Sequence, residues 1–398
     1  MTSTASGTLM PELASREAYI EYFTDEASGA LVSGSKLERT YIKSHILETV
    51  RNHGGAPNAA MSFAAATEHR AVQIDDGTFT IGLDDGIVGL MEGVDTRFPV
   101  LHSLQLSDKL DGLVNRAVRH SAWLDRVWLS AGFFDGLWEW TKATAHPHRL
   151  AKLKIDFEGK FEEPTAHDDI EDAAEDEYAT EVVETRRSTF EIAPRVGELD
   201  KVLTNLRDVH SPAFSTVRLN IPSADRGGHA VWHNGKVTNA STSFAEHLKV
   251  VRHVTSTYST MTKALEDRVW YGESEEYGGL AGQPVMLQFG ARLPRETFHT
   301  WAEKTFNNKR NAFRLGGRPM WSGSDRSRLH VYGIDRHVWQ PITLEATRDH
   351  LLVVLPRGTC GNTVNRLITN VQRQLSPDVR AWVGGDVYDN RARGASAA

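Results

Sequence analysis

The chain has 398 residues and an ordinary globular composition, 40% hydrophobic and 24% charged, so it is long enough to bury more than one core. Its single cysteine, Cys360, excludes an internal disulfide framework and a cysteine-rich zinc site. No stretch approaches the roughly 18–20 apolar residues that a membrane helix needs. The N-terminus also lacks an apolar leader, and together these features predict a cytoplasmic protein without membrane contact.

The net charge of −7 is unevenly distributed along the chain. Residues 281–398 contain 17 Lys and Arg but 9 Asp and Glu, a net charge of +8, so the first 280 residues carry −15. This asymmetry predicts that the C-terminal third contacts an anionic partner or an acidic part of its own chain.

The N-terminal part combines helical and strand patterns. Apolar residues three and four apart predict helices at 13–23, 35–50, 107–119 and 122–140, with Ser107 as an N-cap. Short alternating runs separated by Asp-Gly turns predict a β-meander at 71–74, 78–83 and 87–91. A further strand is expected at 98–104 and another at 150–161. We therefore expect a mixed helix and β-meander domain over residues 11–161, after a disordered tail at 1–10.

The composition changes sharply after this domain. In residues 162–184 nearly half of the side chains are Asp or Glu and none is Lys or Arg, which is typical of a solvated linker. Beyond it, two successive strand–helix–strand–strand–helix patterns cover 185–282 and 283–388. We interpret them as two ferredoxin-like (βαββαβ-type) units, followed by a disordered tail at 389–398, in an α+β chain.

The sharpest local feature is a buried-type strand at 351–355 that leads into a Gly-bounded loop and a helix at 363–375. Five consecutive apolar residues predict an interior strand. The loop contains Arg357, Gly358, Thr359 and Gly361, and a helix N-terminus there would favour an anion. A plain strand–helix connection that uses Gly for a tight turn and Thr359 or Asn362 as a cap explains the same residues.

Cys360 lies in the same loop and is a weak candidate for a catalytic nucleophile, because a helix N-terminus lowers the pKa of a thiol. His337 and His350 are the weak candidates for an acid or base beside it. No Walker, nucleophile-elbow, dinucleotide-binding or HExxH motif is present, and no cofactor is assigned. The pairs Asp75/Asp76 and Asp84/Asp85 fit hairpin turns better than a metal site, and His229 and His233 are too far apart on a strand to share one ion.

Basic and aromatic residues are interleaved between 292 and 357, a composition found where proteins contact phosphates and unpaired bases. The residues assigned to this possible binding surface are Arg292, Lys309, Arg310, Arg314, Arg318, Trp321, Arg326 and Arg328, with residues 316–326 as a mobile basic loop. A solvated basic surface over an aromatic core is the alternative interpretation.

Three functional hypotheses follow. The first is a non-catalytic module of a multi-component intracellular system that contacts RNA or single-stranded DNA through the basic C-terminal third. The second is an enzyme that acts on a phosphorylated small molecule or nucleotide at residues 358–363. The third is a structural protein that uses its acidic and basic segments to bind a partner protein or another copy of itself.

Overall fold

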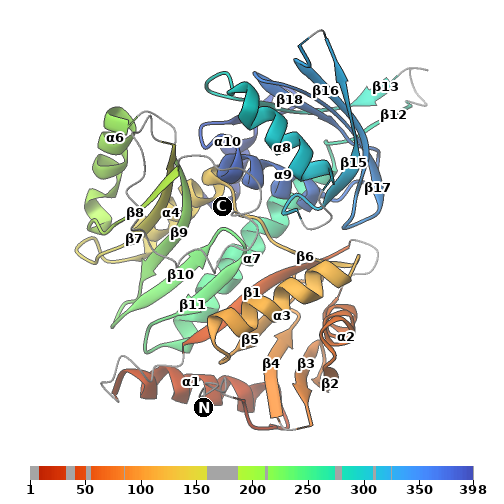
Figure 1. The fold of residues 1–398 in the computed structure, drawn as a ribbon. Coiled ribbons are helices and arrows are strands. Elements are labelled where there is room, and N and C mark those ends of the chain that lie inside the picture. Colours follow the sequence, from red (N-terminus) through yellow and green to blue (C-terminus); the bar gives the residue numbers. More distant parts are fainter. Residues whose placement is uncertain are drawn as a thin grey trace, which may run out of the picture. The chain divides into compact units, whose positions relative to one another are not determined.

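The computed structural model describes residues 9–32, 41–50, 55–84, 86–158, 187–210, 214–273, 280–307, 311–323 and 325–397 (Figure 1). The chain divides into two compact units, each made of two chain segments. Unit 1 comprises Met1–Val127 and Asn220–Ser259, and unit 2 comprises Trp128–Leu219 and Thr260–Ala398. The mixture of helices and antiparallel strands confirms the predicted α+β class.

Unit 1 is built on an antiparallel sheet. Its strands are β1 (Ile42–Thr49), β2 (Arg70–Asp75), β3 (Thr78–Leu83), β4 (Gly86–Glu92), β5 (Val100–Ser103), β10 (Gly228–Trp232) and β11 (Lys236–Asn239). They lie in the order β2-β3-β4-β5-β1-β11-β10, and the short β6 (Leu124–Arg126) pairs with the end of β1. The first and last parts of this sheet are therefore supplied by segments more than a hundred residues apart.

Helices cover both faces of the unit 1 sheet. One core contains side chains of α2 (Ala56–Thr67) and α3 (Ser107–His120), among them Phe63 and Leu110. The other contains side chains of α1 (Arg16–Val32) and of the first part of α7 (Phe244–Glu266), among them Phe23 and Phe244. Because both faces are covered, the central strands are buried along their whole length.

Several predictions for unit 1 are confirmed. The β-meander appears as β2, β3 and β4, and the strand at 98–104 appears as β5. The Asn-Gly turn joins β10 to β11 with Gly235 at φ 78°, a conformation that glycine tolerates. The helix at 107–119 is also present, but Leu106 occupies its N-cap position without a side-chain hydrogen bond, so the assignment of Ser107 as the cap is wrong.

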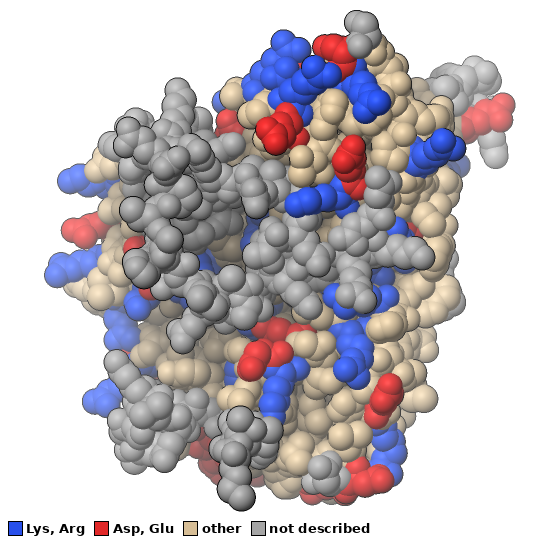
Figure 2. Space-filling view, viewed as in Figure 1, with Lys and Arg blue, Asp and Glu red and all other residues tan. Residues whose placement is uncertain are grey.

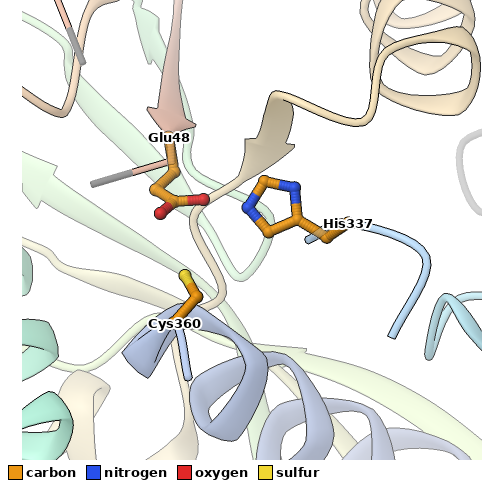
Figure 3. A group of neighbouring side chains, drawn as sticks. All are labelled: Glu48, His337 and Cys360. Carbon is orange, nitrogen blue, oxygen red and sulfur yellow. The ribbon is translucent and has the colours of Figure 1, made fainter. Parts of the chain in front are cut away.

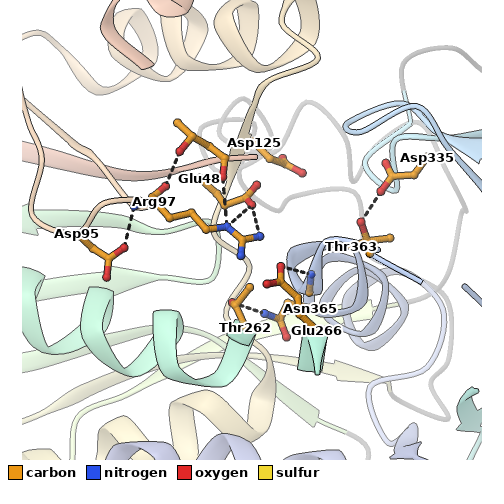
Figure 4. A network of polar contacts seen from close by, with 12 residues as sticks. Glu48, Asp95, Arg97, Asp125, Thr262, Glu266, Asp335, Thr363 and Asn365 are labelled. Atoms are coloured by element: carbon orange, nitrogen blue, oxygen red, sulfur yellow. Dashed lines mark hydrogen bonds and ion pairs between the residues drawn. The ribbon is translucent and has the colours of Figure 1, made fainter. Parts of the chain in front are cut away.

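The helix predicted at 35–50 is wrong, because residues 42–49 form β1 and 33–40 lie outside the described residues. All eight residues of β1 are buried, although five of them are polar. Lys43 donates to the carbonyl of Gln105, and Arg97 binds Glu48 with Nη2 at 2.7 Å (Figure 4). These long-range partners stabilise polar side chains on a central strand, and helical periodicity in the sequence carries no information about them.

Unit 2 contains one small group of elements around α4. This group comprises α4 (Ala131–Thr144), β7 (Lys152–Glu158), β8 (Arg187–Ile192), the 3-10 turn η1 (Val196–Glu198), α6 (Leu199–His210), β9 (Phe214–Pro222, whose end belongs to unit 1) and α10 (Tyr388–Ala397). The helix predicted at 122–140 is instead β6 followed by α4. Residues 389–397, predicted to be a disordered tail, form α10, which packs on α4 so closely that Gly132 faces the backbone of Asp389.

A seven-stranded antiparallel sheet forms the larger part of unit 2. Its strands are β14 (Val285–Gln288), β15 (Leu315–Ser322), β16 (Arg328–Asp335), β17 (Gln340–Thr347), β18 (His350–Val354), β19 (Arg380–Val383) and β20 (Asp386–Val387). Their order is β15-β16-β17-β18-β14-β19-β20. The helices α8 (Arg295–Asn307) and α9 (Gly361–Gln374) lie on one side of it (Figure 1). A two-stranded ribbon, β12 (Tyr271–Glu273) and β13 (Leu280–Gly282), precedes the sheet.

The interior position predicted for the strand at 351–355 is confirmed, because β18 lies between β17 and β14. The mobile basic loop predicted at 316–326 is wrong. Residues 315–322 form β15, which pairs with β16 at eight successive positions, and this pairing gives a Gly-rich stretch an extended conformation.

Two predicted segments have other outcomes. The acidic linker at 162–184 lies outside the described residues, as do residues 1–8 of the tail predicted at 1–10. The end of that predicted tail is ordered, because Met10 is buried and its backbone pairs with Ile87. The first predicted ferredoxin-like segment, 185–282, contributes to both units, whereas the second, 283–388, lies wholly in unit 2.

In the part of the chain that the structure describes, no helix combines the length and apolar character needed to cross a membrane.

Candidate functional site

The seven-stranded sheet of unit 2 has one covered and one exposed face. Along β16, Leu329 and Val331 are buried, while His330 and Tyr332 point the other way. The same alternation runs through β14, β17, β18 and β19, as expected for a period of two residues. The buried set faces the side that α8 and α9 cover, so the other side of the sheet remains accessible.

We call this accessible side the open sheet face, and the strand register arranges its residues in three rows. The rows are Arg318, Tyr332, Thr343 and Val354; Met320, His330, Glu345, Leu352, Met286 and Trp382; and Ser322, Arg328, Thr347, His350, Gln288 and Arg380. Tyr332 is 69% exposed and Met320 44%. Such large apolar and aromatic side chains are usually buried, and several of them on one sheet face mark a candidate interaction surface.

The open sheet face is mainly basic. Arg318, Arg328 and Arg380 stand on it, and Glu345 is the one acidic side chain among the residues of its three rows. The Glu345 carboxylate lies 3.6 Å from Arg328 Nε and 3.5 Å from His330 Nδ1. Arg318 and Arg380 form no ion pair with any residue that the structure describes. Two guanidinium groups therefore remain available to an anionic partner.

The structure places the predicted basic and aromatic residues in different environments. Arg318 and Arg328 lie on the open sheet face. Trp321 lies on the covered side, where its ring centroid is 5.6 Å from that of Phe298 and 4.4 Å from that of His299 on α8. Lys309 and Arg310 lie outside the described residues.

Three other predicted arginines lie in turns. Arg314 and Arg326 both have positive φ angles, 53° and 54°. Arg292 is exposed before α8, with its Nε 3.7 Å from Asp349. Figure 2 shows Lys and Arg side chains mixed with Asp and Glu side chains at the top of the view, where Figure 1 places α8 and the tips of β15 and β16. Acidic side chains therefore partly offset the positive charge at this edge of the seven-stranded sheet.

The loop before α9 is a tight turn. The Thr359 hydroxyl donates to the carbonyl oxygen of Pro356 at 2.6 Å, and Cys360 is the N-cap residue without a side-chain hydrogen bond. The predicted capping by Thr359 or Asn362 is therefore wrong. The guanidinium of Arg357 lies 5.0 Å from the centre of the Trp270 ring.

The N-terminus of α9 already has an anion beside it. The backbone N–H of Gly361 donates to Glu266 Oε1, on α7, at 2.9 Å (Figure 4). A carboxylate is stabilised by the positive end of a helix dipole, as any bound anion would be. Glu266 is 9% exposed, so this internal contact occupies the position where the sequence predicted an external anion.

Two of the three weak catalytic candidates come together in unit 2. A ring nitrogen of His337 lies within 4.8 Å of Cys360 Sγ, and both residues are buried (Figure 3). His337 follows β16 and Cys360 precedes α9, so their closeness depends on the packing of two loops. His350 is elsewhere, on the open sheet face, with Nδ1 3.1 Å from the Thr347 hydroxyl.

The sequence-based predictions did not place Met320, Arg380 and Trp382 on one exposed surface with Tyr332 and His330. The signal that could have found them is the alternation at Leu329 and Val331 on one strand and at Ile342, Leu344 and Ala346 on the next, where every second residue is apolar and buried. The residues between them face away from the core by the geometry of a strand.

Comparison with known proteins places the chain in a family. A curated relative from Methanocaldococcus jannaschii, described as uncharacterized protein MJECL33, is 25% identical over 163 residues. The alignment covers 41% of this chain and spans 38% of that relative's length. No solved structure matches the chain. A family model, MJECL33-like protein, matches residues 23–390. The chain therefore belongs to the MJECL33-like protein family.

Proposed function

We propose that the protein binds single-stranded nucleic acid through the open sheet face, as a non-catalytic module of a multi-component intracellular system. The observation that carries the proposal is the pairing of Tyr332 with Arg318. The two residues are directly opposite each other on β16 and β15, and both are exposed. An aromatic ring can stack on an unpaired base while a neighbouring guanidinium binds a phosphate.

The chemistry of the whole face supports an unpaired strand over a duplex. Stacking on Tyr332 or Trp382 requires a base that is free of its partner. The side chains of Met286 and Leu352 lie between these two aromatic residues. They provide an apolar surface that can contact bases but does not bind phosphates. The two unpaired arginines, Arg318 and Arg380, stand at opposite parts of the face and could bind successive phosphates of one strand.

The strand order supports a ferredoxin-like arrangement of residues 283–388. The four strands of the predicted βαββαβ pattern would be β14, β17, β18 and β19, with α8 and α9 as its two helices. In the sheet these strands lie in the order β19-β14-β18-β17, as that pattern requires. The β15–β16 hairpin would then be an addition at the sheet edge. An arrangement with both helices on one face leaves the opposite face open to a ligand, and four-stranded sheets with exposed aromatics bind RNA bases in this way.

The proposal is tested by fluorescence anisotropy with a labelled oligonucleotide of mixed sequence, as single-stranded RNA, single-stranded DNA and duplex. We expect binding of the single strands at about 50 mM salt, with affinity that falls steeply toward about 200 mM. Tyr332→Ala should weaken binding by roughly 1–3 kcal/mol, the usual contribution of one stacked base. Arg318→Gln with Arg380→Gln should lower the magnitude of the slope of log K against log salt by about 1.4, since each single-strand phosphate contact contributes about 0.7.

Matched controls are Trp123→Ala and Arg116→Gln, an exposed aromatic residue and an exposed arginine of unit 1. They should leave both affinity and salt dependence unchanged. The proposal fails if the folded protein binds no single strand at low salt, or if Tyr332→Ala binds as well as the parent. If Tyr332→Ala instead dissociates an oligomer in sedimentation, the face serves self-association, which was the third hypothesis.

An enzyme at residues 358–363 is the second candidate function. It is favoured by the closeness of Cys360 and His337 and opposed by Glu266 at the start of α9. Hydrolysis of phosphorylated metabolites by the parent, and its loss in Cys360→Ala, would establish the second candidate. Equal turnover in both proteins would remove Cys360 from it.

A further inference from the structure

A pocket of about 520 Å³ opens in unit 1. It is bounded by the start of α1, the turn between β2 and β3, the loop after β4 and the middle of α7. Its charged lining residues are Arg16, Asp76, Glu92, Asp95 and Arg252. Among the described lining residues Val94 alone has an aliphatic side chain, and none is Phe, Tyr or Trp. Pockets for nucleobases or lipids are mainly apolar and aromatic, so this lining indicates a small and very polar ligand.

Glu92 is a fixed anion in the wall of this pocket. Its side chain is 5% exposed, and Arg16 Nε donates to Oε2 at 2.9 Å. Burial alone would raise the pKa of Glu92, but His102 and Arg16 outweigh it and lower the pKa to about 2. The other oxygen, Oε1, is buried and faces His102 Nε2 at 3.5 Å. This oxygen is buried against the histidine, so Glu92 acts on the pocket through its fixed negative charge.

A buried chain of hydrogen bonds holds His102 in place behind Glu92. The Ser44 hydroxyl lies 2.7 Å from His102 Nδ1 and 2.7 Å from His247 Nε2. The Ser44 hydroxyl has one proton and can donate only one of these two hydrogen bonds, so a histidine N–H must donate the other. With a proton on His102 Nε2 toward Glu92, Ser44 donates to His102 and accepts from His247. This series of hydrogen bonds favours the ionised form of Glu92, whose carboxylate is held between His102 and Arg16.

The remaining charges face the ligand from other elements. Asp95 is already bonded, since its oxygens accept from the Arg97 N–H at 2.8 Å and from the Ser259 hydroxyl at 3.0 Å. Asp76 is exposed on the β2–β3 turn. Arg252 is exposed on α7 and forms no ion pair with the part of the chain that the structure describes. The pocket therefore offers one open guanidinium, at Arg252, together with the exposed carboxylate of Asp76 and the fixed negative charge of Glu92.

We infer that this pocket binds a small zwitterion of the amino-acid class, with its ammonium group at Glu92 and Asp76 and its carboxylate at Arg252. A ligand with an anionic group alone would meet three carboxylates in the lining, and one with a cationic group alone would leave Arg252 without a partner. A molecule with both groups satisfies both parts of the lining. This inference concerns unit 1 and is independent of nucleic-acid binding by unit 2.

The test is thermal unfolding and titration calorimetry of the full chain with the α-amino acids at millimolar concentration. The expected result is a rise in Tm with at least one amino acid and none with its decarboxylated amine or with the matching acid that lacks the amine. Arg252→Gln should weaken binding by roughly ten- to a hundredfold, the usual effect of removing one charged hydrogen-bond partner. Lys249→Gln, an exposed cation on the same helix that does not line the pocket, is the matched control and should bind as the parent does.

Glu92→Gln should also abolish binding, and circular dichroism separates loss of ligand from loss of fold. Because Glu92 holds Arg16, this variant could unfold, and Arg252→Gln then carries the test alone. The inference is overturned if no amino acid shifts Tm. It is equally overturned if the acid without an amine binds as well as the amino acid, or if Arg252→Gln binds normally.

Discussion

The guanidinium Nη2 of Arg366 lies 2.5 Å from Oδ1 of Asp335, and neither side chain is more than 1% exposed. The same carboxylate accepts hydrogen bonds from the Thr363 hydroxyl and from the His337 backbone N–H (Figure 4). Arg366 Nε donates to the carbonyl oxygen of Phe313 at 2.9 Å. The pair thus links the end of β16 to the first turns of α9 inside unit 2.

Removing one partner of this pair should be strongly destabilising, because it leaves the other charge buried without compensation. We expect Asp335→Asn to lower the free energy of unfolding by roughly 3–5 kcal/mol. The control is Asp386→Asn, which weakens the pairs of an exposed carboxylate with Arg268 and Arg391 and should cost about 1 kcal/mol or less. Urea unfolding followed by circular dichroism measures both, and equal small losses would contradict the assigned role of the buried pair.

Gly282 and Gly358 should respond differently to alanine. Gly282 has φ 115°, and an added Cβ would lie 1.5 Å from the carbonyl oxygen of Trp270, so the backbone has to move. Gly358 has φ 85°, with nothing within 4 Å of an added Cβ. Gly358→Ala should cost about 1–2 kcal/mol from backbone strain alone, and Gly282→Ala roughly 3 kcal/mol or more. The urea midpoints of the two variants measure this difference. A larger loss of stability in Gly358→Ala than in Gly282→Ala would contradict the close approach of Gly282 to Trp270.

The stability of the protein should fall as pH is lowered from 6.5 to 4. Burial lowers the pKa of His229 to about 4, against the opposing effect of Glu246, whose Oε2 lies 3.9 Å from His229 Nε2. In this range the unfolded chain binds a proton at His229 that the folded chain excludes, so stability rises with pH and is lost below 6.5. The loss from this group is on the order of 2–3 kcal/mol. Burial also holds the pKa of His247 well below its usual range, which adds in the same direction.

Urea unfolding at several pH values measures this dependence. His229→Gln should flatten the curve between pH 6.5 and 4, because its side chain has no proton to exclude. His148→Gln, at an exposed loop position, should leave the curve unchanged. If His229→Gln keeps the pH dependence of stability seen in the unmodified protein, other groups are responsible for it.

Cys360 should react slowly with thiol reagents. It is 4% exposed and the only cysteine in the chain, so labelling reports on it alone. In the folded protein the rate should be set by local opening, on the order of a hundredfold or more below the rate in urea. Native-state labelling at the rate of a free thiol, with unchanged circular dichroism, would show that the sulfur is accessible.

Local turn chemistry made much of the fold predictable. Asp-Gly and Asn-Gly gave the hairpins β2–β3 and β10–β11, because Gly77 and Gly235 adopt positive φ angles that few other residues tolerate. The apolar run of β18 predicted an interior strand, because consecutive apolar residues require both faces of a strand to be covered. In each case the information lies within a few neighbouring residues.

The remaining features depend on residues far apart in the chain. The strand β1 was predicted as a helix because its polar side chains find partners such as Gln105 and Asp111 only in the folded unit. Neither the closeness of His337 to Cys360 nor the arrival of Glu266 at Gly361 has a signature in spacing. The open sheet face was foreseen as a basic and aromatic region, but the register that selects Tyr332 and excludes Trp321 comes from strand pairing.

The two-segment construction of unit 1 has a consequence for synthesis on the ribosome. Strand β1 pairs with β5 on one side and β11 on the other, and Ser44 reaches His247, 203 residues later. At the usual rate of translation these residues are made roughly 10–40 s apart. During this interval one edge of β1 lacks its partner strand while its buried charges stay in water. A nascent chain that stalls within Trp128–Leu219 would therefore carry an unfinished sheet that is open to pairing with a neighbouring nascent chain.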